Sequence, residues 1–515
     1  MMPSIFQTED DLLQLIASLT NESKFKHRDF VESLIGFCTN NAFNAKLGVI
    51  FGLRSTGKTV GMLQAAEFLL RQGNKVAFAR FNRHDQGMGN ANREILTLAK
   101  AGYSHFFIDN APYLEGFMNS CTEWSDLFAP QHRLKIIITG SDSFSLWSLM
   151  HGELCDRYVC FLTNSNTLSE CKRLLGKGYD ECKADGGLFL EGYAPISELS
   201  LDSTDANIEN FIECAVVYNL THSLKLCTED YTSTGNYYTD WLYAIDKPIV
   251  YKSVLYLLEQ AAVAMIKKNL MRNSSEQCFS NLAETIDKWS SLEKSRITSE
   301  FFRNLFEIKY PENTVGVLLV FLIKIGLLIE SGSFEVISNK LHYTKMLQTV
   351  HFAHPALLSY ALDQANKSLM SIRDIDTELL SRSIAMASER ALNENIVYCH
   401  FIRLADKSDK IFPYHDMQDR VIDVVSVNRR LNRLRLVEVE NKSEIDDSMV
   451  FENEAKALYD KEILKIIGVD EKFSITRIIA YKGENKRMSN DDGDLFLLNI
   501  EYLLHRIKDL EKPNF

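Results

Sequence analysis

Secreted, membrane-spanning and zinc-stapled proteins carry sequence features that this chain lacks. Its longest apolar run, 315–329, is interrupted by Gly316, Lys324 and Gly326 and is shorter than a bilayer span requires. Its ten cysteines include no C-x-x-C pair, which argues against a disulfide framework and against a zinc site. No basic and apolar signal segment opens the chain. We therefore expect a cytoplasmic protein with reduced thiols and no membrane contact.

The chain also lacks a surplus of positive charge. Its 57 Lys and Arg residues are outnumbered by 69 Asp and Glu residues, and the net charge is −12. Such a protein has no bulk attraction for nucleic acid, so any binding to DNA requires a local basic patch. The hydrophobic share of 46% and the charged share of 24% are those of a soluble globular protein. At 515 residues the chain exceeds a single core, so we expect about two to four domains.

A glycine-rich stretch, residues 52–59, carries the strongest functional signal. It reads G-x-x-x-x-G-K-T and lies between the apolar segment 47–51 and a helical segment that begins at Val60. In this context the glycines let backbone N–H groups point at phosphate oxygens, and the helix N-terminus favours negative charge. An ordinary glycine-rich turn is the alternative. The residues predicted to bind the nucleotide are Gly52, Arg54, Ser55, Thr56, Gly57, Lys58 and Thr59.

Apolar segments at 75–79, 105–109 and 135–141 alternate with helical segments beyond this P-loop. Near-continuous apolar strands joined by crossover helices predict a parallel sheet that is covered on both faces. Ligands of such sheets bind at the carboxyl ends of the strands. Polar residues at those ends are therefore candidate functional groups.

Several of these candidates have expected roles in binding and hydrolysing ATP. Lys58 should reach the β- and γ-phosphates, and the Thr59 hydroxyl should ligate Mg²⁺. Asp109 ends its strand and fits the acidic Walker B position that holds Mg²⁺, with a helix N-cap as its alternative. Asn110 follows it, where many ATPases place a glutamate. An amide can position water but cannot take its proton, so we expect slow hydrolysis or the use of another acid such as Glu115.

The next strand ends in Thr139, Ser141 and Asp142, which lie where a polar sensor of the γ-phosphate is expected. A plain turn is the alternative. Arg157 is a candidate charge-stabilising finger by its position.

The order of these motifs resembles the archaeal-type predicted ATPase family, P-loop proteins of the AAA-like/STAND lineage. The resemblance is carried by residues 52–59, 107–109, 139–144, 153–157 and 185–187. It implies an ATP- and Mg²⁺-binding switch with a C-terminal nuclease-like domain, and a mobile-element or genome-defence setting. It is also compatible with a homo-oligomer, because arginine fingers in this lineage often act across subunits.

A second chemical signal lies near the C-terminus. A strand that carries Asp423 is followed by a polar turn and a second strand, 434–442. Alternate residues of a strand share a face, so Glu438, Glu440 and Lys442 project together, and a hairpin brings Asp423 beside them. Two carboxylates that bind a hard divalent cation, with a lysine beside the activated water, can hydrolyse phosphodiesters. A solvated sheet edge with surface ion pairs is the alternative.

The D-x(n)-E-x-K spacing of Asp423, Glu440 and Lys442 resembles the PD-(D/E)xK nuclease superfamily, with Ile422 where proline is common. The resemblance implies that Asp423 and Glu440 bind a metal ion and that Lys442 is catalytic. It adds Glu394, from the preceding helix, as a further acidic ligand. The helix and strand that follow complete an αβββαβ-like order.

Charge and helix patterns suggest two DNA contacts. Between Arg420 and Lys442 six bases accompany three acids, a local patch that suits either a phosphate backbone or an ordinary solvated turn. The apolar helix 314–325 and a predicted hairpin at 326–337 resemble a winged helix, although such a helix suits a core more than a DNA groove.

The sequence thus predicts a multidomain α/β protein with two candidate functions. One is an ATP-binding switch that controls a metal-dependent nuclease domain acting on DNA, and the other is a regulatory NTPase with a catalytically inactive nuclease-like domain. The expected domains are N-terminal helices that cover one edge of the next domain (1–45), a P-loop ATPase core with a parallel sheet (46–195), a helical lid or insert (196–275), a winged-helix-like module (276–362) and a restriction-endonuclease-like α/β domain (378–515).

Overall fold

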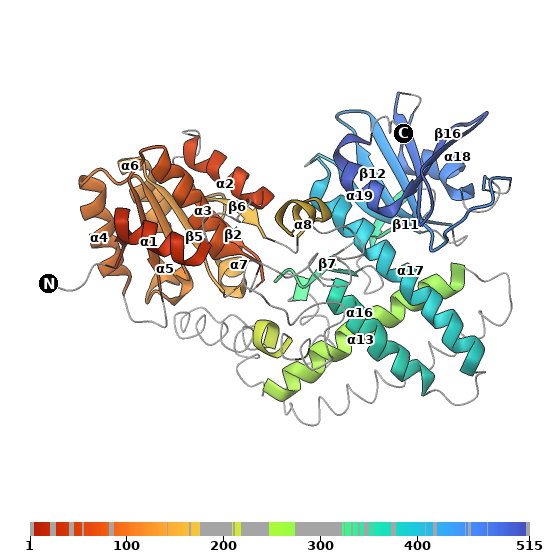
Figure 1. Cartoon of the computed structure of the whole chain (residues 1–515), viewed down its shortest axis with the longest axis horizontal. Coiled ribbons are helices and arrows are strands. Elements are labelled where there is room, and N and C mark those ends of the chain that lie inside the picture. Colours follow the sequence, from red (N-terminus) through yellow and green to blue (C-terminus); the bar gives the residue numbers. More distant parts are fainter. Residues whose placement is uncertain are drawn as a thin grey trace. The chain divides into compact units, whose positions relative to one another are not determined.

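A computed structural model gives the three-dimensional arrangement of the chain. It describes residues 5–20, 27–40, 46–53, 56–81, 87–141, 143–163, 166–175, 209, 212–217, 247–272, 322–323, 325–330, 333–337, 340–344, 350–353, 355–371, 377–406, 408–415, 420–448, 450–451, 455–470 and 472–510. The chain divides into two compact units (Figure 1). The first comprises Met1–Val254 and Gly316–Leu327, and the second comprises Leu255–Val315 and Leu328–Phe515.

A mostly parallel sheet is the centre of the first unit, with the strand order β1-β3-β4-β5-β2-β6. β2 pairs in parallel with β5 and β6, and β4 pairs in parallel with β3 and β5, so that β5 separates β2 from β4. Every residue of β2, β4 and β5 is buried, as expected for apolar strands covered on both faces. The predicted parallel sheet is confirmed. Its strands are β1 (Gln7–Thr8, antiparallel to β3), β2 (Leu47–Phe51), β3 (Val76–Arg80), β4 (His105–Asp109), β5 (Lys135–Thr139) and β6 (Tyr158–Leu162).

Helices cover both faces of this sheet (Figure 1). Phe107 packs with the apolar residues of α1, α2 and α3, whereas its neighbours Phe106 and Ile108 pack with those of α4 and α7 on the opposite face. The helical segments of the unit are α1 (Glu9–Thr20), α2 (Asp29–Thr39), α3 (Lys58–Arg71), α4 (Met88–Lys100), η2 (Ala111–Tyr113), α5 (Phe117–Ser120), η3 (Trp124–Phe128), α6 (Ala129–His132), α7 (Ser143–His151), α8 (Leu168–Leu175) and η4 (Ile212–Val217).

The N-terminal helices lie against a face of the sheet, and the prediction that they cover an edge is wrong. Their apolar residues, including Leu12 and Val31, join the same cluster as α3 and the strands. The approach of α2 to α3 is close, because a Cβ atom at Gly61 would lie 2.2 Å from the Phe30 ring. Glycine at this position lets α2 pack directly over the helix that follows the P-loop.

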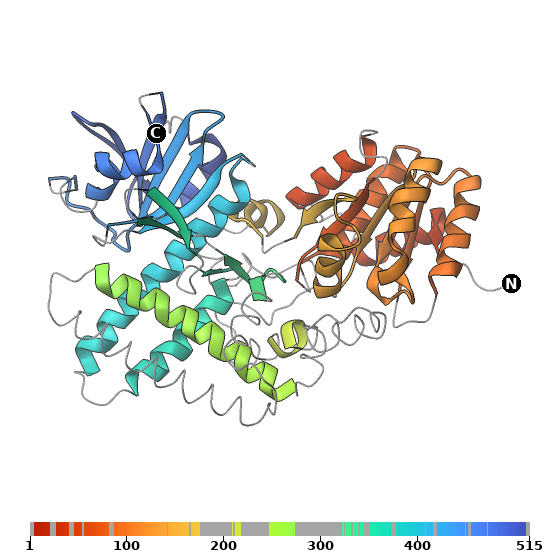
Figure 2. The ribbon, with the colours of Figure 1, turned by 180° about the vertical axis from the view of Figure 1, so that it is seen from behind.

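A larger mixed sheet is the centre of the second unit (Figure 2). Its strand order is β15-β16-β14-β13-β12-β11-β8-β9. β11, β12 and β13 are antiparallel neighbours, and β13 pairs in parallel with β14. With α17 before β11 and α18 before β14, the expected αβββαβ order is present. The strands are β8 (Ser333–Ile337), β9 (Lys340–Thr344), β11 (Lys410–His415), β12 (Val421–Asn428), β13 (Arg433–Val439), β14 (Ser474–Tyr481), β15 (Lys486–Asn490) and β16 (Gly493–Asn499).

Helices and a small two-stranded sheet complete the second unit. One face of the large sheet packs against residues of η7 and α18, including Leu458 and Ile463. β7 (Leu328–Glu330) pairs with β10 (Val350–Phe352). The helical segments are α16 (Pro355–Met370), α17 (Thr377–Leu404), η7 (Lys456–Tyr459), α18 (Lys461–Ile467), α19 (Ile500–Arg506), η8 (Ile507–Asp509) and α13 (Lys247–Arg272), whose residues from Leu255 onward belong to this unit.

The hairpin predicted at 326–337 does not form. β7 pairs with β10, whereas β8 forms a hairpin with β9 and also lies parallel to β11, so that β8 and β9 extend the large sheet. Local alternation of apolar residues predicts that strands exist, but it does not select their partners. Most of helix 314–325 and of the expected lid 196–275 lies outside the described residues. Within the described part of the chain, no helix has the length and apolarity needed to cross a membrane.

Candidate functional site

The P-loop lies between the carboxyl end of β2 and the first turn of α3. Gly57 has a φ of 78°, a left-handed conformation that favours glycine, and immediately precedes Lys58. The Lys58 ammonium turns back and donates to the backbone oxygens of Gly52, at 2.8 Å, and Leu53, at 2.6 Å. A Cβ atom at Gly52 would lie 2.1 Å from the Thr163 backbone oxygen, so the loop passes too close to β6 for a side chain there. The two hydrogen bonds to Gly52 and Leu53 hold the Lys58 ammonium over the loop. Arg54 and Ser55 lie outside the described residues.

Asp109 brings the predicted Mg²⁺ ligands together. It ends β4 with only 3% of its surface exposed, and its Oδ2 accepts a hydrogen bond from the Thr59 hydroxyl at 2.9 Å. The same oxygen accepts from Arg80 Nε at 2.8 Å. Arg80 ends the neighbouring strand, directly opposite Asp109 in the parallel register. The sequence analysis missed Arg80, although its place at the carboxyl end of a strand next to Asp109 is a signal that could have revealed it.

Asn110 and Ser141 form a second contact at this edge of the sheet. Asn110 adopts the left-handed conformation, with φ 56° and ψ 39°, which asparagine tolerates better than most residues. Its Oδ1 accepts from the Ser141 backbone N–H at 3.2 Å and from the Ser141 hydroxyl at 3.1 Å. Thr139 is buried and donates to the Ile50 backbone oxygen, so it supports β2 and is not turned toward a ligand. Asp142 lies outside the described residues.

A buried ion pair between Arg28 and Glu170 supports the P-loop. Arg28 donates to the Thr56 backbone oxygen at 2.6 Å and pairs with Glu170 through Nε, at 3.2 Å, and Nη2, at 3.3 Å. The pKa of Glu170 is lowered: burial alone would raise it, but the Arg28 charge and hydrogen bonds from Arg28, Thr167 and Asp29 outweigh burial. The Thr56 hydroxyl lies 2.7 Å from that of Thr163. No sequence motif marked Arg28, Thr163 or Glu170.

Arg157 is not brought to the P-loop within this chain. It precedes β6, and its backbone oxygen accepts from the N–H of Leu47, the first residue of β2. Because β2 and β6 are parallel, this is the amino end of the sheet, opposite the nucleotide site. Its side chain pairs with Asp126 at 2.8 Å, and both side chains are more than 40% exposed. The role predicted for Arg157 is therefore not supported within one copy of the chain. Glu115 is exposed, and its backbone oxygen accepts from Met88.

The donor set at the carboxyl edge of the first sheet fits a Mg²⁺-bound nucleotide. An ammonium, a hydroxyl and a carboxylate, from Lys58, Thr59 and Asp109, converge there beside the N-terminus of α3. These are the groups that P-loop proteins use for phosphate oxygens and for the metal ion. In the structure Lys58 donates to backbone oxygens of the P-loop, and Thr59 donates to Asp109.

The carboxylates of the second unit lie where a helix and a hairpin meet. Asp423 projects from β12 and accepts from the Val439 backbone N–H of β13 at 2.9 Å. Glu394 comes from α17, and Glu440 directly follows β13. All three are at most 7% exposed. The structure thus brings the predicted acids from three separate elements into one buried cluster. Burial raises the pKa of Glu440, and the nearby charges of Arg390, Arg272 and Lys442 lower it only in part.

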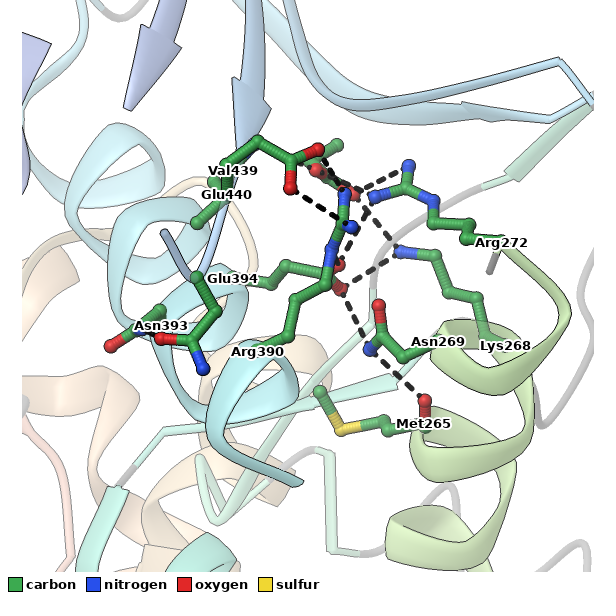
Figure 3. A network of polar contacts seen from close by, with 11 residues as sticks. Met265, Lys268, Asn269, Arg272, Arg390, Asn393, Glu394, Val439 and Glu440 are labelled. Atoms are coloured by element: carbon green, nitrogen blue, oxygen red, sulfur yellow. Dashed lines mark hydrogen bonds and ion pairs between the residues drawn. The ribbon is translucent and has the colours of Figure 1, made fainter. Parts of the chain in front are cut away.

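Basic side chains, rather than open space, fill this cluster (Figure 3). Arg390, one turn before Glu394 on α17, contacts both Glu440 oxygens at 3.0 and 3.2 Å and Glu394 at 3.3 Å. From α13, Lys268 lies 3.1 Å from Glu394 and 3.2 Å from Asp423. Arg272 lies 3.2 Å from Glu394 and 2.8 Å from Asp423. Sequence reasoning missed all three cations because none belongs to the nuclease-like motif.

The acids of this cluster have pKa values that are shifted in opposite directions. The pKa of Glu438 is raised to about 8, mainly by burial and further by Asp423 and Glu440. The pKa of Asp423 is lowered, because Arg272, Lys268 and Arg390 together outweigh its burial. The carboxyl groups of Glu394, Asp423 and Glu440 face the cations of Lys268, Arg272 and Arg390, which supply positive charge at these buried acids.

The arrangement does not fit a divalent cation. Among the described residues, no group of three or more His, Cys, Asp or Glu side chains is placed to hold a metal ion. The oxygens of Glu394, Asp423 and Glu440 point instead at ammonium and guanidinium groups. The predicted metal set is thus brought together as a buried cluster but is arranged for ion pairing in this structure.

The predicted basic patch is largely used for local contacts. Arg420 pairs with Asp460 and Glu462, and Arg433 pairs with Asp409. Arg429 donates to backbone oxygens at the end of α18, and Arg435 is only 1% exposed. Arg420 and Arg433 are thus partly buried in ion pairs and Arg435 is buried, whereas Arg429 remains exposed.

Comparison with known proteins identifies one part of the chain. Residues 44–171 match the model of a protein family described as an AAA domain. This segment includes the P-loop, Asp109 and Ser141, and its similarity to an AAA domain supports a P-loop ATPase domain over these residues.

Other comparisons add nothing to that assignment. None of the curated proteins matches the chain. Among solved structures, the S. cerevisiae Hsp104–ADP complex is 12% identical, with 78% of this chain and 61% of that chain covered and a TM-score of 0.28. This chain thus spans less than two thirds of that protein's length, and a likeness of this size supports no argument about fold or function.

Proposed function

We propose that the protein is a slowly hydrolysing, ATP-binding switch. The single observation that carries the proposal is the convergence of Lys58, Thr59 and Asp109 at the carboxyl edge of a parallel sheet. When bound, Mg²⁺ and ATP supply the polarised phosphoryl group. Lys58 holds the phosphate charge, Thr59 and Asp109 hold the metal ion, and Asn110 and Ser141 orient water or the γ-phosphate. Asn110 cannot act as a base, which supports slow turnover.

Substitution of Lys58 by alanine tests the nucleotide site. We expect ATP affinity, measured by isothermal titration in Mg²⁺, to fall at least about tenfold, or about 1.4 kcal/mol. Arg71→Ala on the same helix is the matched control, because Arg71 is 73% exposed and pairs only across one helical turn with Glu67. Equal ATP affinity in the two variants would contradict the assignment.

For the second unit we propose a restriction-endonuclease-like domain that acts on DNA under control of the ATPase domain. The α17–β11–β12–β13–α18–β14 order and the juxtaposition of Asp423 and Glu440, with Lys442 two residues after Glu440, support this proposal. The ion pairs at all three acids favour a second candidate, a regulatory NTPase whose nuclease-like domain is inactive.

A cleavage assay separates these two candidates. Plasmid and linear DNA are incubated with the protein and Mg²⁺ or Mn²⁺, with and without ATP, beside a Glu440→Gln variant. Cleavage that exceeds that of the variant supports the nuclease. Equal background in every condition supports the inactive, regulatory domain.

A further inference from the structure

Helix α13 places a row of polar groups against the acidic cluster. Lys268 and Arg272 are one turn apart and therefore lie on the same face of the helix, and Asn269 lies beside them (Figure 3). Asn269 is fully buried, donates to the Met265 backbone oxygen at 3.1 Å and lies 3.5 Å from Glu394. Arg272 has a side chain that is only 10% exposed. Asn269 and Arg272 are therefore packed inside the second unit, and their contact with the acidic cluster is not a surface ion pair.

The two α13 cations bridge the same two carboxylates. Each of Lys268 and Arg272 contacts both Glu394 and Asp423, at distances of 2.8 to 3.2 Å. Those carboxylate side chains are 3% and 2% exposed, so their charges need compensation from the protein or from a bound cation. Two monovalent side chains supply the charge that one divalent ion would supply.

We propose that α13 is a cationic latch: Lys268 and Arg272 occupy the Glu394–Asp423 pair and exclude a divalent cation until the helix moves. Arg390 belongs to α17 itself, so its contacts with Glu440 and Glu394 do not depend on α13. The latch makes metal binding and the α13 contact mutually exclusive, because oxygens that ligate Mg²⁺ or Mn²⁺ cannot also pair with a guanidinium that fills the same space. It explains why acids arranged as in a nuclease do not form a metal site here. The latch regulates the proposed nuclease site. Only this regulatory role rests on the proposed function, because competition between the two cations and a metal ion can be tested without it.

Direct metal binding tests the latch without relying on DNA cleavage. Mn²⁺ is titrated into the full chain by isothermal titration, and bound ion is counted by electron paramagnetic resonance. We expect the Lys268→Gln/Arg272→Gln variant to gain one site with at least about tenfold higher affinity than the wild type, or about 1.4 kcal/mol. Addition of Asp423→Asn to this variant should remove the gained site.

A matched control separates the effect of losing two positive charges from the effect of where those charges lie. Lys367→Gln/Arg382→Gln removes two cations from exposed pairs on helices of the same unit. It should leave Mn²⁺ affinity unchanged. A folded latch variant with wild-type Mn²⁺ affinity would overturn the proposal, as would an equal gain in the control.

A second measurement needs no substitution. In the wild type, saturating Mn²⁺ should increase hydrogen exchange of the α13 backbone around residues 265–272, because the ion and the latch compete. Unchanged exchange with Mn²⁺ bound at Asp423 would overturn the latch even if the double variant fails to fold. A gained Mn²⁺ site without any DNA cleavage would support the latch and contradict the nuclease. Cleavage by the wild type without any change in α13 would support the nuclease and contradict the latch.

Discussion

Asp109 receives contacts from two directions at the end of β4. Its Oδ2 is shared by the Thr59 hydroxyl, which belongs to the P-loop helix, and by Arg80, which belongs to the neighbouring strand. Thr59 is part of the family motif and was predicted, whereas Arg80 became visible only when the parallel register placed it opposite Asp109. At the scale of single residues, the site thus contains one positive charge more than its motif suggests.

This extra charge leads to a prediction for Arg80→Gln. Arg80 competes with Mg²⁺ for the Asp109 carboxylate, so its removal should lower the Mg²⁺ concentration needed for half-maximal nucleotide binding by about two- to fivefold, or about 0.4–1 kcal/mol for a partly exposed pair. Titration of Mg²⁺ at fixed ATP with a fluorescent nucleotide measures the effect. Arg71→Gln is the control. An unchanged or higher Mg²⁺ requirement would show that Arg80 does not compete with the ion.

Asn110 offers a second residue-scale prediction. Asn110→Ala removes the acceptor of the Ser141 N–H and places alanine in a left-handed conformation, so the ATPase domain should lose about 1–3 kcal/mol of unfolding free energy. Asn110→Gly removes the same acceptor without the conformational cost and should be less destabilised, by about 1 kcal/mol. Urea unfolding of both variants measures the difference. Equal stabilities would show that the left-handed backbone costs nothing here.

At the scale of elements, a buried ion pair connects Arg28, the residue before α2, with Glu170 of α8. Arg28 and Glu170 have side chains that are only 6% and 4% exposed. Removal of one partner leaves the other as an uncompensated buried charge, which is far more costly than loss of a surface pair. The support of the P-loop therefore depends on elements that lie outside its motif.

We expect Glu170→Ala to destabilise the first unit by about 3–5 kcal/mol at pH 7. Because the pKa of Glu170 is lowered from 4.5 in the folded protein, the contribution of its charge is present above about pH 4.5 and is lost as the pH falls through the folded pKa. The wild-type and variant stabilities should therefore converge on acidification in urea unfolding at different pH values. Asp126→Ala, which removes the exposed partner of Arg157, should cost about 1 kcal/mol or less. Similar losses in the two variants would contradict the buried role of the Arg28–Glu170 pair.

At the scale of the whole molecule, the residues proposed to bind ATP belong to one compact unit and the acidic cluster to another. ATP that binds the first unit should stabilise that unit alone, by about 2.7 kcal/mol at a free concentration one hundred times Kd. Differential scanning calorimetry should then show one transition that rises with ATP and one that does not. Lys58→Ala should abolish the shift. A single transition that rises with ATP would indicate that the units unfold as one, and an equal shift of two transitions would contradict stabilisation of the first unit alone.

The sequence by itself determined the features that depend on neighbours along the chain. A glycine-rich loop between an apolar strand and a helix, a strand that ends at Asp109, and a strand that ends shortly before Ser141 follow from local geometry and backbone hydrogen bonding. The Asp423 strand and its partner were predictable for the same reason, because only a short polar turn separates them.

Only the tertiary structure decided which distant groups meet. Lys268 contacts Glu394 and Asp423 across 126 and 155 residues, and Arg28 reaches Glu170 across 142. β8 likewise pairs with β9 and β11 in the large sheet instead of forming the expected wing with β7. A charged side chain or an unpaired strand edge can be satisfied by many partners, and its spacing in the sequence does not select among them. Chain packing and the cost of leaving buried charges uncompensated make that selection.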